Sequence, residues 1–265
     1  GANVNPTEGY ELSSPLGEAT YLDWFEGAEF LLKVGANVNA SLGRVISDKY
    51  MDSVPYLLSP LGWAISNKAE YMAGLLLQHG ADVLATNMFD GNSSQSALIY
   101  SLCQRSSPVL VDLLLAEIRD FEKHPGWEYA LEIAIEDLDD DGIDVYKLLI
   151  EKISSLPPHL RRNAIQRGWD ALPASCIHDN EGNLPEVIEV LIELGVYLDC
   201  HAEDGSTLLQ RMARHGHHKC CLFLVDRGAA INTNATQGYG TALQEAIKQR
   251  EVKIADLLLE HGAEV

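Results

Sequence analysis

The C-terminal stretch from Gly240 to Val265 reads GTALQEAIKQREVKIADLLLEHGAEV, and it predicts two short helices joined by a turn at residues 249–250. The hydroxyl of Thr241 can cap the first helix, and Gly262 can end the second because glycine readily adopts the left-handed conformation found there. Helical spacing predicts that the pair buries Leu243, Ala246, Ile247, Val252, Ile254, Ala255, Leu257, Leu258 and Leu259. Two helices of this length bury little apolar surface, so we expect the hairpin to stack on others.

The pattern of this hairpin recurs along the chain. A glycine that opens a Gly-Ala-Asn-Val-Asn-like phrase stands at positions 1, 35, 80, 195, 228 and 262. A Ser or Thr followed two residues later by Leu marks a helix start at positions 14, 59, 96, 207 and 241. In four hairpins the glycine follows this start by the same 21 residues. Three of the glycine-to-glycine steps are 33 or 34 residues, and such a period indicates a repeat protein stabilised by stacking.

These motifs resemble the ankyrin-repeat family. Its Thr-Pro-Leu-His-like helix start, its Leu-Leu-Leu second helix and its Gly-Ala-Asp-Val-Asn-like exit are matched most fully at 206–232 and 240–265. The variants Tyr239-Gly-Thr-Ala-Leu-Gln244 and Ser59-Pro-Leu-Gly-Trp-Ala64 look like those of the multi-ankyrin proteins of filamentous fungi. The resemblance implies an all-α ankyrin solenoid of about seven helix-turn-helix repeats with short finger loops.

The repeats are expected to form a single domain over residues 1–265, which looks like a fragment of a longer array. The approximate repeat boundaries are 9–40, 59–83, 96–118, 126–153, 160–199, 204–232 and 238–265, and residues 1–5 are the tail of a preceding repeat. The middle repeats are irregular. Insertions are expected at 41–57, at 84–95 and at 137–142, and a loop is expected at 173–184.

Composition excludes several classes of function. The chain has 39 acidic and 19 basic residues and a net charge of −20, which opposes binding to nucleic-acid phosphates. No apolar run approaches the roughly 18 residues of a membrane span. Five cysteines are an odd number in no disulfide framework, and this usage is typical of a reducing, intracellular compartment. We therefore expect a cytoplasmic, monomeric fragment that binds neither nucleic acid nor membrane.

No pattern of residues supports catalysis, a cofactor or a metal. The run from Asp137 to Gly142 begins like a calcium loop, but its twelfth position is Leu148 where a bidentate Glu is required, so a solvated turn is favoured. The His and Cys residues at 215–221 do not have standard zinc spacing. Cys176 and His178 lie in the irregular loop without a nucleophile elbow around them. We predict that the fragment is not an enzyme.

The remaining candidate is a surface for a protein or peptide partner. The resemblance implies that this surface comprises the finger loops and the exposed face of the first helices. On that face the candidate partner-binding residues are Tyr21, Trp63, Asn67, Tyr100, Gln104, Glu136, Asp137, Arg211, Arg214, His215 and Lys248. Aromatic and arginine side chains are common interface anchors. For Trp63 and Tyr100, stacking between adjacent repeats is the competing interpretation.

The charge of this face is expected to change sign along the chain. It is acidic at Glu136 and Asp137 and basic at Arg211, Arg214 and Lys248, which favours an extended partner of opposite polarity. Two alternatives stay open: a regulatory or targeting module of a larger enzyme whose catalytic domain lies outside these residues, and a spacer. In some ankyrin proteins the exit-phrase asparagines are hydroxylated, but a local turn role explains Asn5, Asn39 and Asn232 adequately.

Overall fold

The computed structural model describes residues 4–5, 14–40, 42–46, 54–85, 87–89, 93–124, 126–136, 138, 140–175, 183–202, 204–234 and 240–265. The chain divides into two compact units, Gly1–Ala130 and Leu131–Val265. In each unit, short helices form antiparallel hairpins that stack on their neighbours in the chain. The predicted stacking of helix-turn-helix units is therefore confirmed within each unit.

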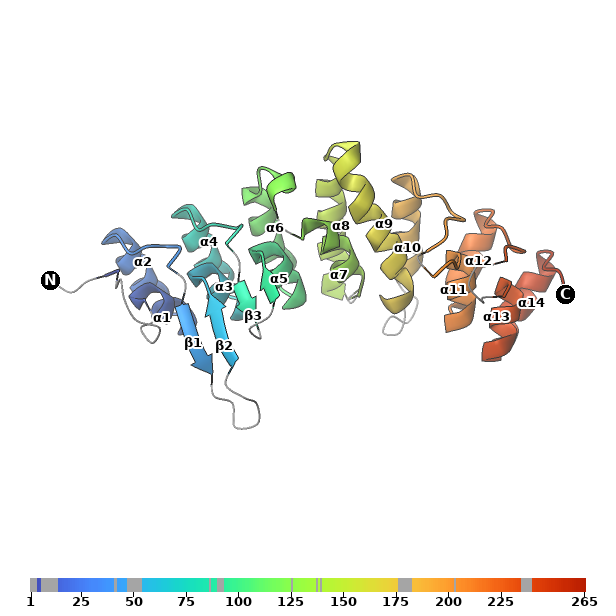
Figure 1. Cartoon of the computed structure of the whole chain (residues 1–265), viewed down its shortest axis with the longest axis horizontal. Helices are drawn as coiled ribbons and strands as arrows, with labels where there is room; N and C mark the ends of the chain where they lie inside the picture. Colours follow the sequence, from blue (N-terminus) through green and yellow to red (C-terminus); the bar gives the residue numbers. More distant parts are fainter. Residues whose placement is uncertain are drawn as a thin grey trace. The chain divides into compact units, whose positions relative to one another are not determined.

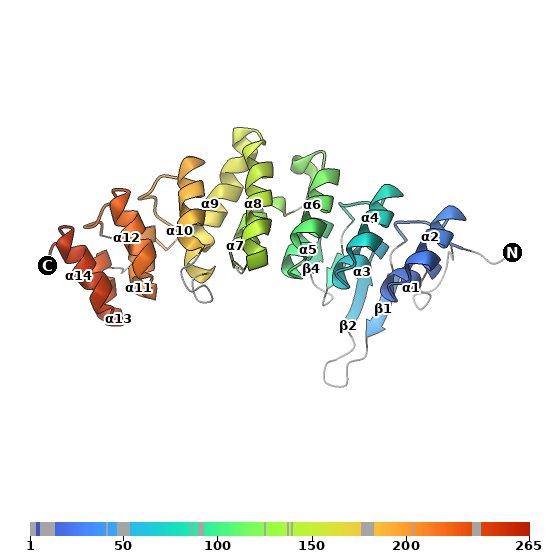
Figure 2. The ribbon, with the colours of Figure 1, turned by 180° about the vertical axis from the view of Figure 1, so that it is seen from behind.

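The described residues of the first unit form three helical hairpins in two rows. The hairpins are α1 (Pro15–Tyr21) with α2 (Phe25–Lys33), α3 (Pro60–Ser66) with α4 (Glu70–Gln78), and α5 (Ala97–Cys103) with α6 (Pro108–Glu117). The first helices α1, α3 and α5 contact one another in sequence, as do the second helices α2, α4 and α6 (Figures 1 and 2). Two 3-10 turns, η1 (Phe121–Lys123) and η2 (Trp127–Tyr129), follow.

Local sequence determines where these helices begin. Ser14 and Ser59 have extended backbones, and their hydroxyls accept hydrogen bonds from the amides of Gly17 and Gly62 at 3.1 and 3.0 Å. The proline after each serine suits the first helical position, where its missing N–H removes no helical bond. These caps confirm the predicted helix starts.

The long connections of the first unit contain short strands that the sequence analysis did not predict. They are β1 (Leu42–Ile46), β2 (Val54–Leu58), β3 (Asn87–Phe89) and β4 (Ser93–Gln95). They form one antiparallel sheet in the order β1-β2-β3-β4, in which Arg44 is paired with Tyr56. The β1–β2 hairpin projects from the side of α1 and α3 (Figure 1). Two of the expected finger loops are therefore extended β-hairpins added to the helical fold.

Four pairs of consecutive helices are seen in the described part of the second unit. These are α7 (Ala130–Glu136) with α8 (Asp140–Ser154), α9 (Pro158–Ser175) with α10 (Leu184–Glu193), α11 (Leu208–His215) with α12 (His218–Asp226), and α13 (Ala242–Gln249) with α14 (Val252–Glu260). The first helices α9, α11 and α13 contact one another in turn, and so do the second helices α10, α12 and α14. The irregular fifth repeat, α9 with α10, therefore supplies one helix to each row of this unit.

Two expectations about this middle region were wrong. The turn predicted around residues 137–142 is shorter, because residues 140–142 already form the first turn of α8. The loop expected from Pro173 begins later, since α9 continues to Ser175.

The predicted C-terminal hairpin is confirmed, with three corrections to its buried face. Thr241 caps α13 in a reciprocal capping box with Gln244, and Gly262 has a φ of 92°. Ile247, Val252 and Leu259 are exposed, although helical spacing suggested burial. Within the described chain this hairpin contacts a neighbouring hairpin on one side only, so its other apolar face is uncovered.

Candidate partner-binding surface

The predicted aromatic anchors of the first unit lie in its core. Trp63 of α3 is 4% exposed and Tyr100 of α5 is 1% exposed. The half-buried Tyr21, at the end of α1, packs edge-to-face on Trp63 with ring centroids 5.0 Å apart. These contacts correspond to the competing interpretation, in which the aromatic rings fill the space between repeats.

Asn67 and Gln104 cap corresponding helices of the first unit. Asn67 is exposed at the end of α3, and its side-chain amide donates to the carbonyls of Thr20 and Tyr21 at 3.1 and 2.9 Å. It therefore ties the end of α3 to the end of α1. Gln104 is half-buried at the end of α5. Both residues are therefore at least partly accessible, and Asn67 also has a structural role because it joins α3 to α1.

Arg211 of α11 is buried against α9. Its guanidinium donates to the carbonyls of Asp170 and Trp169 at 2.8 and 3.2 Å. The helical partner of the Trp169 carbonyl would be the amide of residue 173, which is a proline without an N–H. Arg211 thus stabilises the end of α9, and it is 6% exposed, so little of it is available to a partner.

Three of the predicted partner-binding residues lie exposed on adjacent first helices of the second unit. Arg214 and His215 end α11, and Lys248 lies near the end of α13. The pKa of His215 is lowered by partial burial and by the positive charges of Arg214 and Arg211. A histidine whose protonation is disfavoured therefore lies beside the exposed guanidinium of Arg214, and that guanidinium is suited to hydrogen bonding and to attraction of acidic groups.

Lys248 is held by a buried carboxylate. Its ammonium is 2.6 Å from the carboxylate of Glu245, which also accepts from the amide of Gly240 at 3.0 Å. Burial alone raises the pKa of Glu245, but these two donors outweigh it and hold the pKa below its ordinary value. Lys248 is thus an oriented, exposed cation.

The acidic end of the predicted face is described in part. Glu136 is exposed at the last position of α7. Asp137 lies outside the described residues, as do Cys176 and His178. The charges of Arg214, Lys248 and Glu136 are therefore all presented to solvent in the second unit.

The exit-phrase asparagines connect consecutive repeats. Asn232 donates to the carbonyl of Gly262 at 3.1 Å and accepts from the amide of Glu264 at 2.9 Å. Asn39 makes the same pair of bonds to Gly80 and Asp82, at 3.3 and 2.8 Å. The expectation of bonds to the local backbone was wrong, because both side chains bridge to the next repeat.

The His and Cys residues near α12 do not assemble into a metal site. Cys220, Cys221 and His217 are all buried. Within the described ranges no group of three or more His, Cys, Asp or Glu side chains could hold a metal ion. None of the described helices has the length and the apolar composition that crossing a membrane requires.

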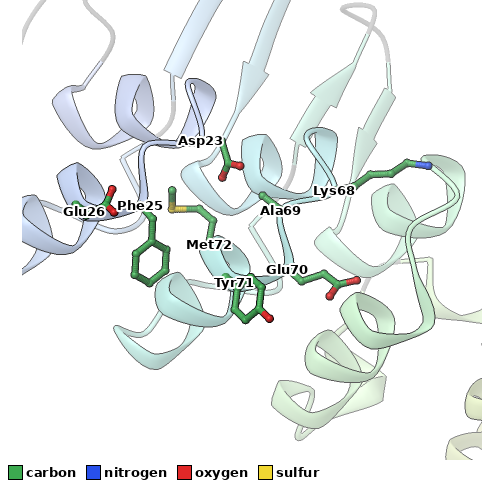
Figure 3. A pocket seen from close by; sticks show the side chains of 8 residues that line it. All are labelled: Asp23, Phe25, Glu26, Lys68, Ala69, Glu70, Tyr71 and Met72. Carbon is green, nitrogen blue, oxygen red and sulfur yellow. The ribbon is translucent and has the colours of Figure 1, made fainter.

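Sequence reasoning missed a hollow on the second-helix side of the first unit. It has a volume of about 580 Å³ and is lined by residues that include Phe25, Tyr71 and Met72 (Figure 3). Its signal was present in the sequence, because large aromatic residues stand at positions of α2 and α4 that face away from the core. Periodicity alone does not show that such residues are clustered.

Comparison with known proteins agrees with this architecture. Residues 174–265 match the family model described as ankyrin repeats in three copies. A stretch of 59 residues is 41% identical to an ankyrin repeat protein of Rickettsia felis, and it covers 22% of this chain and 26% of that relative. The human ASB11 ankyrin repeat domain is similar in structure, with a TM-score of 0.59 and 18% identity over 96% of this chain and 100% of that domain. The family model is therefore matched over the C-terminal third of the chain, and the predicted ankyrin-repeat fold is confirmed over nearly its whole length.

Proposed function

We propose that this chain is a non-catalytic recognition module that binds a protein or peptide through the exposed ends of its first helices and its extended fingers. The observation that carries the proposal is the presentation of Arg214, His215 and Lys248 on adjacent repeats of the second unit. Arg214 and Lys248 are exposed cations on a chain with a net charge of −20. Such a local basic surface favours an acidic segment in a partner.

The burial of Trp63, Tyr100 and Arg211 changes which residues would contact that partner. An anchor must be accessible before binding, so these three side chains support the scaffold instead. The residues proposed to contact an acidic segment of the partner are Arg214, His215 and Lys248. Glu136 is proposed to contact a basic group of the same partner. In the finger formed by β1 and β2, β1 is an edge strand of the sheet, and an extended segment can approach such a backbone edge.

The test is a pull-down from lysate with the whole chain immobilised, followed by mass spectrometry. The variant carries Arg214→Glu and Lys248→Glu, which reverse exposed charges, and its helical circular dichroism confirms folding. The matched control is Lys253→Glu, an exposed reversal on the second helix α14. A protein kept by the wild type and by the control but lost by the double variant supports the proposal. Equal retention by all three contradicts it.

Four finer aspects belong to the same proposal. We propose one domain over residues 1–265, a monomer, a cytoplasmic location and an origin in a filamentous fungus. The fungal origin rests on the phrases at 59–64 and 239–244, and the curated relative described above is bacterial. The alternative is that the chain is the regulatory or targeting module of a larger enzyme. The same pull-down would favour this alternative if the captured protein is a substrate of that enzyme.

A further inference from the structure

The second-helix side of the first unit presents large apolar side chains to solvent. Tyr71 of α4 is 86% exposed, Phe25 of α2 is 38% exposed, and Val109 of α6 is 54% exposed. Single exposed apolar residues are ordinary, but residues gathered at a concave place indicate an interaction site. These three come from consecutive helices of one row, which contact one another.

The hollow between α2 and α4 has an apolar floor and an acidic rim. Phe25 and Tyr71 lie on either side of Met72, which is almost fully buried (Figure 3). The carboxylates of Asp23, Glu26 and Glu70 belong to the same lining. Lys68 is the single basic residue of that lining, and Figure 3 shows its ammonium at the end of an extended side chain that points away from Asp23 and Glu26.

A second hollow continues the first across α4 to α6. It has a volume of about 400 Å³ and shares Phe25, Glu70 and Tyr71 with the first hollow. Its other lining includes Val109 and Leu113 of α6. The hydroxyl of Ser107, the residue before α6, donates to the Glu70 carboxylate, so Glu70 is held between the two hollows. The shared residues make one groove over three second helices.

The dimensions of this groove suit a short helix. Neighbouring packed helices lie about 8–10 Å apart, so a groove over three of them is roughly 16–20 Å long. A helix rises 1.5 Å per residue, which corresponds to about 11–13 residues. An amphipathic helix of this length presents one apolar stripe, with residues at i, i+3, i+4 and i+7, to a hydrophobic groove.

The negative charge at the rim of the groove indicates which charge the residues beside the apolar stripe of the docked helix should carry. Three carboxylates and one ammonium line the first hollow, and the chain as a whole is strongly acidic. An acidic flank would be repelled, whereas Lys or Arg beside the apolar stripe would be attracted. We propose that the groove formed by Phe25, Tyr71, Val109 and the carboxylates of Asp23, Glu26 and Glu70 docks a basic amphipathic helix of a partner protein.

The test uses three synthetic helical peptides of about 13 residues, the length that spans the groove. All three carry Leu at i, i+3, i+4 and i+7, and their flanking residues are all Lys, all Gln or all Glu. Binding to the whole chain is measured by fluorescence anisotropy at low and high salt. The expected order of affinity is Lys, then Gln, then Glu, and the difference between Lys and Gln shrinks at high salt because exposed charges are screened.

Variants of the chain locate the binding site. Tyr71→Ala is expected to weaken the Lys peptide at least about tenfold, as loss of a central aromatic anchor does. Glu26→Gln combined with Glu70→Gln is expected to abolish the preference for Lys over Gln while leaving Leu-dependent binding. The matched control is Tyr197→Ala, which removes an exposed tyrosine from the second unit and should change nothing.

Three results would overturn this inference. They are preference for the Glu peptide, equal binding by Tyr71→Ala and wild type, and no binding of the Lys peptide at millimolar concentration. Self-association of the chain that Tyr71→Ala abolishes, measured by sedimentation, would assign the groove to a second copy instead. The recognition proposed above is independent of this result, because Arg214→Glu with Lys248→Glu should leave peptide binding intact.

Discussion

Arg211 supplies the carbonyl of Trp169 with the hydrogen bond that α9 itself cannot provide. In a regular helix this carbonyl accepts from the amide four residues later, and that residue is Pro173. Arg211 donates to it at 3.2 Å and to the next carbonyl, that of Asp170, at 2.8 Å. A residue of one repeat thus completes the helix of the preceding repeat.

We predict that Arg211→Leu lowers the free energy of unfolding by about 2–3 kcal/mol, because hydrogen bonds from a charged donor to buried carbonyls are lost. Leucine keeps part of the packing volume. Urea unfolding monitored by circular dichroism measures the change. Arg214→Leu, three residues further along α11 and exposed, should stay within about 0.5 kcal/mol of wild type.

Substitution of Pro173 gives a second test of the same role of Arg211. Pro173→Ala restores the missing N–H, so it should stabilise the Arg211→Leu chain by at least about 1 kcal/mol more than it stabilises the wild type. Additive effects of the two substitutions would show that Arg211 does not compensate for Pro173.

The side chains of the exit phrases, which bond the backbone of the next repeat, lead to a second prediction. Asn232 uses both its donor and its acceptor toward the next repeat, whereas Asp199 only accepts, from the amide of Ala230 at 2.8 Å. Asn232→Asp keeps the acceptor and loses the donor, so we expect a loss of about 0.5–1.5 kcal/mol. Asp199→Asn adds a donor, so it should raise the free energy of unfolding. Thermal and urea unfolding of both variants measure these effects.

The helical hairpins were predictable because their signals are local. Thr241 and Ser59 cap helices through atoms three residues away, and Gly262 adopts its left-handed backbone independently of distant contacts. A fixed offset between cap and glycine then gives the repeat. The ankyrin-repeat fold follows from this pattern without knowledge of any contact between repeats.

The candidate site was harder to predict because exposure depends on neighbouring repeats. Trp63 and Tyr100 have the chemistry of interface anchors, but adjacent helices cover them. Ile247 has the periodicity of a core residue, but no described helix covers it. The bonds of Arg211 and Asn232 join residues at least 30 positions apart, and no local pattern encodes them.

His124 gives the third prediction, which concerns pH. It is buried in the first unit, with its Nδ1 3.4 Å from the hydroxyl of Ser96. Burial lowers the pKa of His124 from 6.5 to about 4, although the nearby Glu128 acts in the opposite direction. The unfolded chain therefore binds a proton between these two pH values while the folded chain does not, so stability is full above pH 6.5 and falls as the pH decreases.

We expect this histidine to lower the stability at pH 5 by about 2 kcal/mol relative to pH 7.5. Urea unfolding of wild type and His124→Phe at both pH values isolates its contribution, because the other titrating groups are shared. The variant should lose less stability on acidification than the wild type. Equal losses would show that His124 titrates normally in the folded chain.

The hairpin turns supply the last prediction. Arg250 follows α13 with a φ of 65°, and Gly216 occupies the corresponding place after α11 with a φ of 80°. A residue with a Cβ is strained in this left-handed region by roughly 1–2 kcal/mol, and substitution by glycine relieves this strain. Glycine also has more conformational freedom in the unfolded chain, which cancels part of the stabilisation. Arg250→Gly should therefore raise the free energy of unfolding by about 0.5–1 kcal/mol in urea unfolding. The reciprocal change Gly216→Arg should lower it, because the left-handed backbone at this position strains any residue that has a Cβ. A destabilised Arg250→Gly chain would mean that the arginine side chain makes a stabilising contact that exceeds the backbone strain.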